Sequence, residues 1–420
     1  MKKLLALLLA AAMLLTFVAC ASKPAETQTP AETTTEETAA PAAETETKEE
    51  AAAPAASDGK TYKVAMICDS SINDGGWGAA CYNAMVAAAE KKGWQTEVTD
   101  SISQDAYYDS IVAYCMLGYD MIYAPGNQYT DAVLQAAEEY PDVQFVAMTG
   151  DTARADGLAN FHNAFTGIYE ARYVGGVVAG MKLQQLIDEG KVEDKNKTAD
   201  GKIKIGYVGA YPYAEVVSGY TAFFLGVQSI VPDVAMQVQY TNSWFNITAE
   251  NEAAKALIAD GCIIVSQHAD STGAPSACQE ALDAGTTVYC VGYNVDMLAV
   301  APTAALTSPT NVWEVFYEYA FNAVMNGESF DTNWSQGYEA DAVKLTPLGE
   351  SCAPGTQEKV DETIAAIKDG SLHVFDTSKF TVGGETVTTA PVDLTYYDYS
   401  TGSPVAVYQG ETKEAISDGY

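Results

Sequence analysis

The same order of buried strand, polar loop and helix occurs twice along this chain, and it restricts the fold more than any other feature. The apolar run at 64–68 is followed by a loop over 69–78 that contains two adjacent glycines, and then by an alanine-rich helical segment at 79–92. A second apolar run at 202–208 is likewise followed by a polar loop and by a helix that ends at residue 230. Short apolar runs of this kind are typical of parallel strands that are buried on both faces.

Each half continues with the same alternation of strands and helices. In the first half the other expected elements are strands at 96–99, 120–124 and 143–148 and helices at 103–117, 128–140 and 166–189. In the second half they are strands at 237–240, 262–265 and 287–291 and helices at 248–259 and 274–284. Strands that alternate with helices form a parallel sheet with helices on both faces. The sequence therefore predicts an α/β protein of two similar βα lobes that face each other across a cleft.

The boundaries of the two lobes follow from this repeat. We expect lobe 1 at about 61–163 plus 293–325, lobe 2 at about 164–292 plus 326–375, and a C-terminal extension at 376–420 packed across both. The long helix expected at 166–189 carries the small residues Gly175, Gly176, Ala179 and Gly180. Small residues at these spacings allow another element to approach closely, so we interpret them as a helix-packing surface and not as a phosphate-binding loop.

The loops that follow the expected strands carry the candidate binding residues. In open α/β sheets, ligands bind at the carboxyl ends of the strands. Trp77 and Trp244 lie in such loops, one in each half, and their faces suit a flat, hydroxylated or aminated ring whose edge binds amides and carboxylates. The alternative is that both rings pack against neighbouring helices. The candidate ligand-binding residues are Asn73, Asp74, Trp77, Gly126, Asn127, Gln128, Trp244, Gln267, His268, Asp270, Asn294 and Asp296.

The sequence offers little support for catalysis or for a bound metal. The three histidines, His162, His268 and His373, do not stand in a metal-ligand spacing such as H-E-x-x-H, and no G-x-S-x-G or G-x-x-x-x-G-K-[ST] motif occurs. We therefore expect no catalytic residue, no metal and no cofactor. Glycoside hydrolysis by two carboxylates such as Asp270 and Asp296 is an alternative, because that reaction needs only such a pair.

Charge and cysteine content exclude further classes. The chain has 56 acidic and 22 basic residues and a net charge of -34, which argues against a nucleic-acid partner because phosphate binding needs clustered Lys and Arg. The cysteines other than Cys20 are scattered without a C-x-x-C pair, and Cys68, Cys115, Cys262 and Cys290 stand in or beside apolar runs. We expect them to be core thiols and not a disulfide framework or a metal site.

The N-terminus has the features of an exported, lipid-anchored protein. Lys2 and Lys3 precede an apolar run at 4–18, which is long enough for a signal-peptide core but short for a membrane-spanning helix. The run ends in Phe-Val-Ala-Cys20, which resembles a bacterial lipobox, so we expect lipid on Cys20; a plain cleaved signal is the alternative. The segment at 21–60 is rich in Ala, Glu, Thr and Pro and is expected to be a disordered spacer. These features predict attachment to the extracytoplasmic face of the cell membrane.

Several motifs together carry a resemblance to a known family. They are INDGGW at 72–77, YAPGNQYTDAV at 123–133, YEARYVGGVVAG at 169–180, the segment 205–213 followed by Glu215-Val-Val, YTNSWFN at 240–246, SQHADSTG at 266–273, and VGYNVDM with APTAALTSP within 291–309. With them, residues 62–375 resemble the basic membrane protein family of lipoproteins, the purine-nucleoside receptors of ABC transporters. The resemblance implies a type I periplasmic-binding fold, in which hinge strands join two lobes that close around a ligand and pass it to a permease with its ATPase.

The resemblance also implies roles for individual residues. Trp77 and the Trp244 region would enclose a purine, while Asn73 and Asp74 would bind its edge. In relatives a G-x-D-x-D motif supplies a carboxylate to ribose, but here the first aspartate is Asn294. A lysine that relatives carry shortly after a Thr-Ser pair is also missing after Ser308. These departures make the chain resemble more closely the branch that binds purine bases or related small rings. We therefore expect a receptor for a purine nucleoside or a purine base, with an exported nucleoside or glycoside hydrolase and a ligand-binding surface sensor as alternatives.

Overall fold

The computed structural model describes residues 59–149 and 157–375, together with four short strands farther along the chain. The expected signal peptide with Cys20, and the expected spacer up to residue 58, lie outside the described residues. Of the expected extension at 376–420, the four strands are β14 (Thr381–Val382), β15 (Glu385–Thr386), β16 (Thr395–Asp398) and β17 (Ser403–Ala406). Within the part of the chain that is described, no helix has both the length and the apolar character to cross a membrane.

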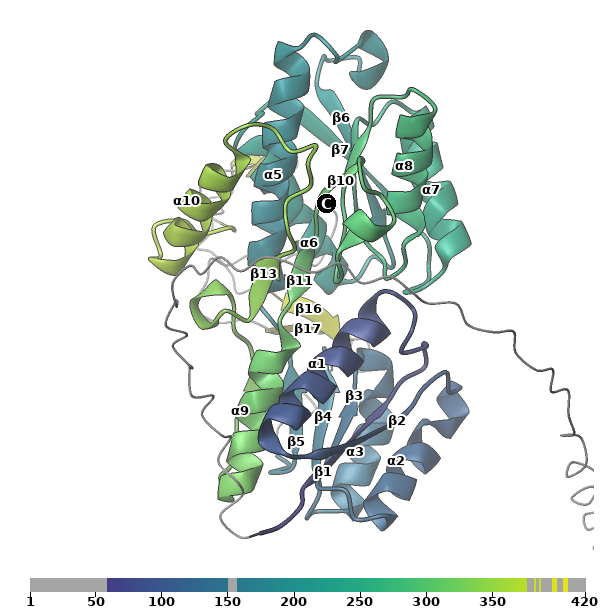
Figure 1. Cartoon of the computed structure of the whole chain (residues 1–420), viewed down its shortest axis with the longest axis vertical. Helices are drawn as coiled ribbons and strands as arrows, with labels where there is room; N and C mark the ends of the chain where they lie inside the picture. Colours follow the sequence, from purple (N-terminus) through teal and green to yellow (C-terminus); the bar gives the residue numbers. More distant parts are fainter. Residues whose placement is uncertain are drawn as a thin grey trace, which may run out of the picture. The chain divides into compact units, whose positions relative to one another are not determined.

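Two parallel sheets form the framework of the protein (Figure 1). The sheet of lobe 1 has the order β12-β5-β4-β3-β1-β2 and that of lobe 2 the order β10-β9-β8-β6-β7. The strands of lobe 1 are β1 (Lys63–Ile67), β2 (Gln95–Thr99), β3 (Met121–Ala124), β4 (Gln144–Met148), β5 (Phe161–Ala164) and β12 (Asn333–Trp334). The strands of lobe 2 are β6 (Ile203–Gly209), β7 (Val234–Tyr240), β8 (Ile264–His268), β9 (Tyr289–Val291) and β10 (Ala305–Thr307).

In lobe 1, the alternation of side chains along each strand separates two apolar layers. Val64 and Met66 of β1 pack toward α1 (Trp77–Lys92) and α9 (Trp313–Asn326). The intervening residues of β1 pack in a second cluster with α2 (Tyr107–Met116) and α3 (Thr130–Glu139). The sheet is therefore covered on both faces, as the near-continuous apolar strands predict.

Lobe 2 follows the same plan with a tighter helix pair. One face of its sheet carries α5 (Ile168–Asp188) and α6 (Ala214–Gln228), the other carries α7 (Ile247–Ala259) and α8 (Gly273–Asp283), and α10 (Thr356–Lys368) packs on α5. A β-carbon built at Gly176 would lie 2.1 Å from the carbonyl oxygen of Phe223, so only glycine allows α5 and α6 to approach this closely. The interpretation of the small residues in this helix as a packing surface is confirmed.

Within residues 59–149 and 157–375, the chain crosses between the lobes three times. The first crossing leads from β5 to α5, the second is β11 (Pro309–Asn311), and the third leads from β12 to β13 (Val343–Leu345). Antiparallel pairing of β11 with β13 and a 2.8 Å hydrogen bond from the amide of Gly167 to the carbonyl of Gln336 hold the crossing segments together. These segments are the hinge strands that the resemblance implied.

The crossings lie at other positions than the expected lobe boundaries. The expectation that residue 293 begins the return to lobe 1 is wrong, because β10 pairs with β9 and keeps the chain in lobe 2 up to β11. The expectation that 326–375 belongs wholly to lobe 2 is also wrong, because β12 pairs with β5 at the edge of the lobe 1 sheet. Both strands are too short to give a periodic apolar signal.

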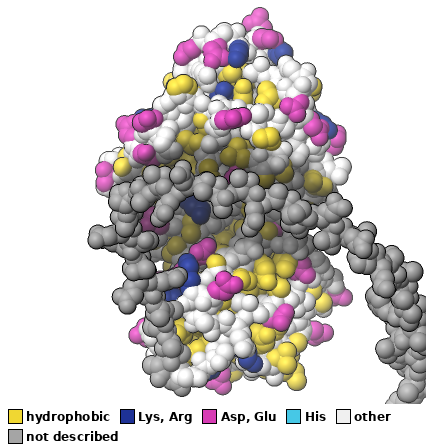
Figure 2. Space-filling view, viewed as in Figure 1, with side chains coloured by type: hydrophobic (Ala, Val, Ile, Leu, Met, Phe, Trp, Pro, Cys, Tyr) yellow, Lys and Arg dark blue, Asp and Glu magenta, His cyan; other side chains and the backbone are white. Residues whose placement is uncertain are grey.

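Most of the expected strands and helices are present, with small shifts at their ends. The strand β5 was missed because it holds polar His162 and Asn163, which are buried by pairing at the sheet edge. The expected core thiols are confirmed, since the thiols of Cys68, Cys115, Cys262 and Cys290 are all buried. Single helical turns occur at η1 (Gln104–Ala106), η2 (Asn127–Tyr129), η3 (Asp194–Asn196), η4 (Met297–Ala299) and η5 (Tyr338–Ala340). Acidic side chains outnumber basic ones over the face shown in Figure 2, as the net charge requires.

Candidate functional site

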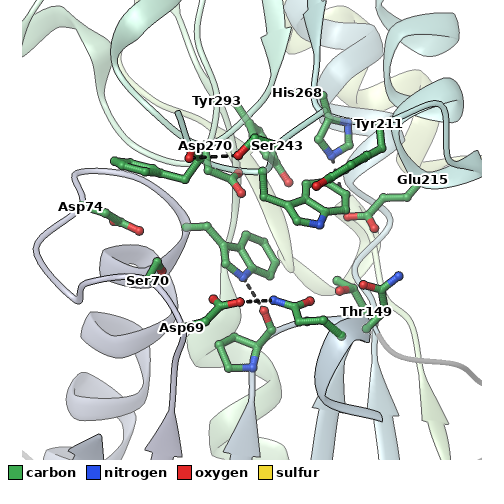
Figure 3. Close-up of a pocket in the computed structure, with 17 residues that line it drawn as sticks. Asp69, Ser70, Asp74, Thr149, Tyr211, Glu215, Ser243, His268, Asp270 and Tyr293 are labelled. Carbon is green, nitrogen blue, oxygen red and sulfur yellow. Dashed lines mark hydrogen bonds and ion pairs between the residues drawn. The ribbon is translucent and has the colours of Figure 1, made fainter. Parts of the chain in front are cut away.

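A cavity of about 380 Å³ lies where the strand-end loops of the two lobes meet (Figure 3). Loops after β1, β3 and β4 line it from lobe 1, and loops after β6, β7, β8 and β9 line it from lobe 2. The lining residues are Asp69, Ser70, Asp74, Trp77, Pro125, Gly126, Asn127, Gln128, Thr149, Tyr211, Glu215, Ser243, Trp244, Phe245, His268, Asp270 and Tyr293. The prediction that the strand-end loops of two lobes enclose a cleft is confirmed.

On the lobe 1 side, Trp77 is held in place by two contacts. Its indole Nε1 donates a hydrogen bond to the carbonyl oxygen of Pro125 at 2.7 Å. Its ring meets Trp313 of α9 edge to face, with the ring centres 5.7 Å apart. The side chain is half-buried, so one part of the ring packs on the lobe and the rest lines the cavity. The ring of Trp77 therefore packs against a neighbouring helix and also lines the cavity, as each of the two predictions for it required in part.

The carboxylate of Asp69 follows β1 directly and is the main acceptor on this side. Its Oδ2 accepts hydrogen bonds from the hydroxyl of Tyr107 and from Nε2 of Gln128, both at 3.0 Å. The backbone amide of Asp69 also donates to the hydroxyl of Tyr129 at 2.6 Å. These contacts fix the carboxylate before any ligand arrives. They also place Gln128, one of the expected site residues, in the cavity wall.

Asp74 lines the cavity, but its carboxylate serves the helix that follows. It accepts hydrogen bonds from the backbone amides of Gly76, Gly78 and Ala79 at 2.8 to 3.1 Å. Orphan amides at a helix N-terminus are normally satisfied by such an acceptor. Asp74 therefore starts α1 from the cavity wall, and its contact with the ligand edge stays a prediction. Asn73 is exposed and lies outside the cavity lining, so the structure does not place it in the cavity with Asp74.

On the lobe 2 side, Trp244 belongs to an aromatic group. Its ring meets that of Tyr211 at 5.4 Å between centres and 63°, and Tyr211 stacks on Tyr213 at 4.9 Å. The neighbouring Phe245 is exposed at the rim of the cavity. The expected placement of Trp77 and Trp244 in one site from opposite lobes is confirmed by their shared cavity.

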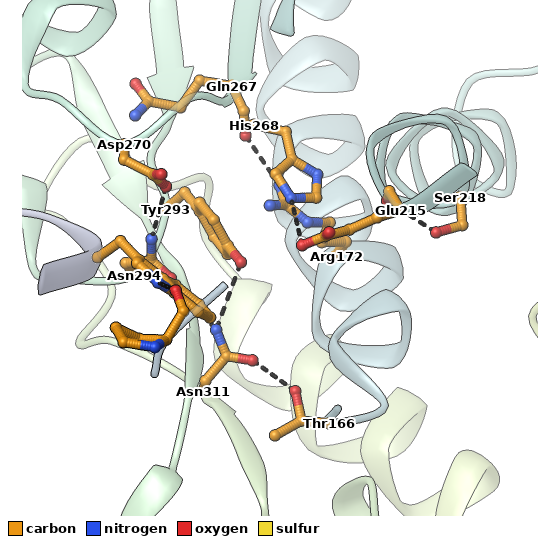
Figure 4. A network of polar contacts seen from close by, with 12 residues as sticks. Thr166, Arg172, Glu215, Ser218, Gln267, His268, Asp270, Tyr293, Asn294 and Asn311 are labelled. Atoms are coloured by element: carbon orange, nitrogen blue, oxygen red, sulfur yellow. Dashed lines mark hydrogen bonds and ion pairs between the residues drawn. The ribbon is translucent and has the colours of Figure 1, made fainter. Parts of the chain in front are cut away.

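Behind this aromatic group lies a buried cation, Arg172 of α5 (Figure 4). Its Nη1 donates to the hydroxyl of Tyr207 at 2.7 Å and to the carbonyl of Gln267 at 2.8 Å. The guanidinium also lies over the ring of Tyr293, 3.8 Å from its centre. Arg172 does not line the cavity itself, but its charge acts on the pKa of Glu215 and of His268, which do.

Glu215 and His268 are the cavity groups most affected by this environment. Nε2 of His268 lies 3.7 Å from the carboxylate of Glu215. Burial raises the pKa of Glu215 to about 7, with the nearby Arg172 opposing the shift. Burial and Arg172 together hold the pKa of His268 well below its usual range. His268 is thus neutral at physiological pH, and the expectation that it lines the site is confirmed.

Asp270 presents its carboxylate to the cavity and is held from behind by Asn294. Nδ2 of Asn294 donates to Oδ1 of Asp270 at 3.1 Å. Asn294 is itself buried outside the cavity lining, so the structure does not bring it into the cavity with the other candidate residues. Gln267 is likewise outside the lining, where its Nε2 donates to the carbonyls of Ala269 and Ser271. Both amides shape the loop that carries Asp270.

Asp296 has a structural contact instead of a place in the cavity. Its Oδ1 accepts a hydrogen bond from the amide of Leu298 at 2.9 Å and so caps η4. Tyr293 lines the cavity but Asp296 does not, so the structure does not place Asp296 with the other candidate residues. The pair Asp270 and Asp296, weighed for glycoside hydrolysis, does not line one cavity.

The residues that the sequence missed have identifiable signals. Asp69 and Ser70 follow β1 directly, and Thr149 follows β4, so the strand-end rule could have included them. Tyr211 stands in the second-half loop that mirrors the first, and Glu215 lies in the first turn of the helix that follows this loop. The role of the remote Arg172 had no local signal, because it depends on α5 packing beneath the β8 loop.

The two lobes also touch directly beside the cavity. A β-carbon built at Gly76 of lobe 1 would lie 1.7 Å from the carbonyl oxygen of Asp270 in lobe 2. One built at the adjacent Gly75 would lie 3.9 Å from Thr272, which is ordinary contact. The absence of a side chain at Gly76 is therefore a condition for this approach of the lobes.

Comparisons with known proteins agree on one class. Residues 61–368 match the family model described as "Bmp: ABC transporter substrate-binding protein PnrA-like". A purine-binding protein of Brucella abortus is 32% identical over 324 residues, which cover 76% of this chain and 85% of that protein. A putative ABC transporter glucose-binding protein of Haloferax volcanii is 31% identical over 326 residues, covering 77% of this chain and 76% of that protein.

A solved structure supports the fold. The ABC transporter solute-binding protein of Aeropyrum pernix K1 superimposes with a TM-score of 0.63 at 17% identity, covering 74% of this chain and 92% of that one. The fold is the type I periplasmic-binding fold that the resemblance implied. The chain belongs to the Bmp family of PnrA-like ABC transporter substrate-binding proteins, which bind their substrates outside the cytoplasm.

Proposed function

We propose that this protein captures a purine, with the free base preferred to the nucleoside, and delivers it to an ABC permease. The observation that carries this proposal is that tryptophans from opposite lobes, Trp77 and Trp244, line one small cavity. Ring faces on both sides of a cavity suit a flat ligand, since stacking acts over its whole surface. A ligand that touches both lobes stabilises their closed arrangement, which is the form a permease can distinguish.

The polar groups of the cavity fit the edge of an aminated ring. Asp69 and Asp270 place carboxyl oxygens in the wall, which would accept hydrogen bonds from ring or exocyclic N–H groups of a ligand. Glu215 adds a third carboxyl whose pKa burial raises to about 7, so it can donate or accept near neutral pH. Among the described residues, no Lys or Arg side chain lines this cavity, whereas four acids do, so a phosphate would meet like charge there without a cationic partner. We therefore infer a neutral, unphosphorylated ligand.

The choice of base over nucleoside rests on two residues. Asn294 stands where the resemblance assigns a ribose-binding carboxylate, and its side chain lies behind Asp270 outside the cavity lining. Asp296, the other acid of that motif, caps η4 instead. Neither side chain lines the cavity, so a ribose there would lack the hydrogen-bond partners that the resemblance assigns to its hydroxyls.

A monosaccharide is the second candidate. Carboxylates beside aromatic faces also suit a sugar ring, whose hydroxyls donate to acids and whose C–H face packs on indole. The relative from Haloferax volcanii is described as a putative glucose-binding protein. The number of aromatic side chains in the wall favours the purine.

The test is a thermal-shift series on the purified chain with adenine, guanine, hypoxanthine, adenosine, inosine, uracil and glucose. Stabilisation by a ligand grows as RT ln(1 + [L]/Kd), about 2.7 kcal/mol at a hundredfold excess over Kd. We expect the purine bases to raise the melting temperature most. Glucose as the best ligand, with no shift from any purine, would contradict the proposal. Chromatography of the inosine sample checks for free hypoxanthine, whose release would instead indicate a hydrolase.

We also propose that the protein is held at the cell membrane by lipid on Cys20, which lies outside the described residues. The lipobox-like sequence before Cys20 supports this anchor. In cells, Cys20→Ser should move the protein from the membrane fraction to the soluble fraction. Unchanged membrane retention of this variant would contradict the anchor without bearing on the ligand.

A further inference from the structure

The side chain of Asn294 connects the cavity with the hinge (Figure 4). This residue follows β9, is 2% exposed, and has a positive φ of 64°, a conformation that Asn tolerates better than most residues. Its backbone is fixed to the second crossing, because its amide donates to the carbonyl of Pro309 at 3.0 Å and its carbonyl accepts from the hydroxyl of Thr310 at 3.1 Å. Its orientation therefore depends on where β11 lies.

A chain of hydrogen bonds leads from the cavity through this residue to the hinge. Nδ2 of Asn294 donates to Oδ1 of Asp270, and its Oδ1 accepts from Nδ2 of Asn311 at 3.2 Å. Oδ1 of Asn311 in turn accepts a hydrogen bond from the hydroxyl of Thr166. Asn311 belongs to the second crossing between the lobes and Thr166 to the first. Two hinge segments are thus linked to one carboxylate that lines the cavity.

We propose that Asn294 is a positioning residue that holds Asp270 as a ligand acceptor and couples that acceptor to the hinge. In this arrangement, Asp270 is aligned for ligand N–H or O–H donors only while β11 and the first crossing keep their closed spacing. Binding at the cavity and closure at the hinge then favour each other. The inference rests on the proposed function to the extent that it takes this cavity as the ligand site.

The two side-chain contacts of Asn294 require an amide and not merely a polar group of the same size. One end of the side chain meets the acceptor Asp270 and the other meets the donor Asn311. An ionised carboxylate at this position accepts at both ends and donates at neither. It would also place a second acid within hydrogen-bond distance of Asp270, where two buried like charges cannot both ionise.

The charge environment of Asp270 makes this requirement testable by pH. Burial and three further acids hold the pKa of Asp270 well above its usual range, while Arg172 acts in the opposite direction. The ionisable groups that face Asp270 are Glu250 of α7, Glu215 of α6, Asp74 before α1, Arg172 of α5, Tyr293 after β9 and Cys81 of α1. A new acid at position 294 would raise the pKa of Asp270 further. Ligand binding would then depend on whether Asp270 and the new acid share a proton.

The experiment compares the wild-type chain with Asn294→Asp and Asn294→Gly, using adenine as the probe from pH 5 to pH 8. Both substitutions accept the positive φ, so backbone strain is matched. We expect Asn294→Asp to weaken binding at least about tenfold at pH 8, and to approach the wild type toward pH 5, where the acid pair holds a proton. Asn294→Gly should weaken binding by a similar factor with no recovery at low pH. The proposal would be overturned if the wild type and Asn294→Asp bind adenine equally at pH 8, or if the loss of adenine affinity in Asn294→Asp does not depend on pH.

The hinge part of the proposal has its own test. Thr166→Val removes the hydrogen bond from Thr166 to Asn311, which is the link farthest from the cavity, and changes no residue that lines the cavity. It should weaken adenine binding roughly threefold to tenfold. Thr363→Val is the matched control. It also removes a buried hydroxyl, but one that lies in α10 and takes no part in the hydrogen bonds that link Asp270 to the hinge. Equal affinities for these two variants would overturn the coupling to the hinge.

A ligand-free measurement separates this inference from the proposed ligand. The folded state of Asn294→Asp should hold the extra proton more tightly than the unfolded state does. Its melting temperature should therefore fall below that of the wild type as pH rises from about 4 to 8. A difference in melting temperature that does not change with pH would contradict the coupling of Asp270 to an acid at position 294, even if adenine binds. If the wild type does not bind adenine but the melting temperature of Asn294→Asp still falls below that of the wild type as pH rises, only the proposed ligand is refuted.

Discussion

The two lobes contribute to the cavity in different physical states. On the lobe 1 side the polar groups are already paired: Trp77 with the carbonyl of Pro125, and Asp69 with Tyr107 and Gln128. On the lobe 2 side, buried atoms lack a hydrogen-bond partner among the described residues, namely Nε and Nη2 of Arg172, Oε1 of Gln267 and Nδ1 of His268. Of these three lobe 2 residues only His268 lines the cavity, and in lobe 1 the buried Nε1 of Trp313 behind Trp77 also lacks a described partner, so the contrast holds for the groups of the cavity wall itself. Paired groups in the wall are held in place, whereas a buried polar atom without a partner is sensitive to a ligand beside it.

This contrast suggests a division of work. Lobe 1 provides a preformed platform for a ring, and lobe 2 provides ionisable groups whose charge is set by burial. The pKa of Glu215 is raised to about 7 and that of His268 is held well below its usual range, so small changes around them alter their charge. Substitutions in lobe 1 should then change affinity at every pH, and substitutions in lobe 2 should change how affinity and stability depend on pH.

The largest effect is expected where the lobes touch. Gly76→Ala places a methyl group where the carbonyl oxygen of Asp270 now lies, so the closed arrangement becomes inaccessible and purine affinity should fall on the order of 100-fold. Isothermal titration measures the affinity. Gly75→Ala is the control, because it has a positive φ and bears local strain without the clash. A similar loss in both variants would assign the effect to loop strain and not to closure.

The two tryptophans provide the direct comparison between platform and opposing wall. Trp77→Ala should weaken purine binding by about 1 to 3 kcal/mol through lost stacking, and Trp244→Ala by a similar amount. Trp77→Phe keeps a ring but loses the hydrogen bond to Pro125, so it should recover part of the loss. Titration of the purified variants measures these differences. Wild-type affinity in Trp77→Ala would remove this residue from the site.

Glu215 tests the pH sensitivity of lobe 2. Its pKa is raised in the folded state from an ordinary 4.5 to about 7, so the folded state binds its proton more tightly than the unfolded state does. The stabilisation from that proton is fully present below pH 4.5 and is lost as pH rises to about 7. The free energy of unfolding of the wild type should fall by about 1 to 3 kcal/mol over this window relative to Glu215→Gln. Denaturant melts at pH 5 and pH 8 measure it, and parallel curves would contradict the raised pKa.

The smallest effect is expected on the outer surface of lobe 1. Lys91 of α1 bridges Glu314 and Glu318 of α9 at 3.2 and 2.9 Å. Exposed ion pairs of this kind contribute about 0.2 to 1 kcal/mol and are screened by salt. Lys91→Met should lower the free energy of unfolding within this range at low salt and leave the purine affinity unchanged. A change in affinity would mean that the platform is less rigid than its paired groups indicate.

The sequence predicted the parts of this molecule that depend on local patterns. The two sheets, the helix-packing glycines and the cavity between strand-end loops follow from apolar periodicity and from the strand-end rule. Eight of the candidate ligand-binding residues line the cavity: Asp74, Trp77, Gly126, Asn127, Gln128, Trp244, His268 and Asp270. These residues come from loops whose position in the fold is fixed by the strands before them.

What the sequence could not predict depends on contacts between distant segments. The direction in which Asn294 and Asp296 point is set by the pairing of the loop after β9 with the second crossing. The charge state of Glu215 depends on Arg172, which lies on another helix. The short strands β10 and β12 are defined by their partners and not by their own residues. Each of these features requires the tertiary structure.

The late position of β12 and α9 has a consequence for synthesis on the ribosome. The strands of the lobe 2 sheet are complete once residue 307 has been made, although that lobe comes second in the chain. The core of lobe 1 still needs the aromatic residues of α9 and Trp334 of β12, which pack on strands translated much earlier. Since domains tend to fold as units while the chain emerges, the first half of this protein must wait for the last quarter before its own core can close. A nonsense mutation between residues 307 and 334 would therefore release a chain with all strands of the second sheet and an incomplete first core.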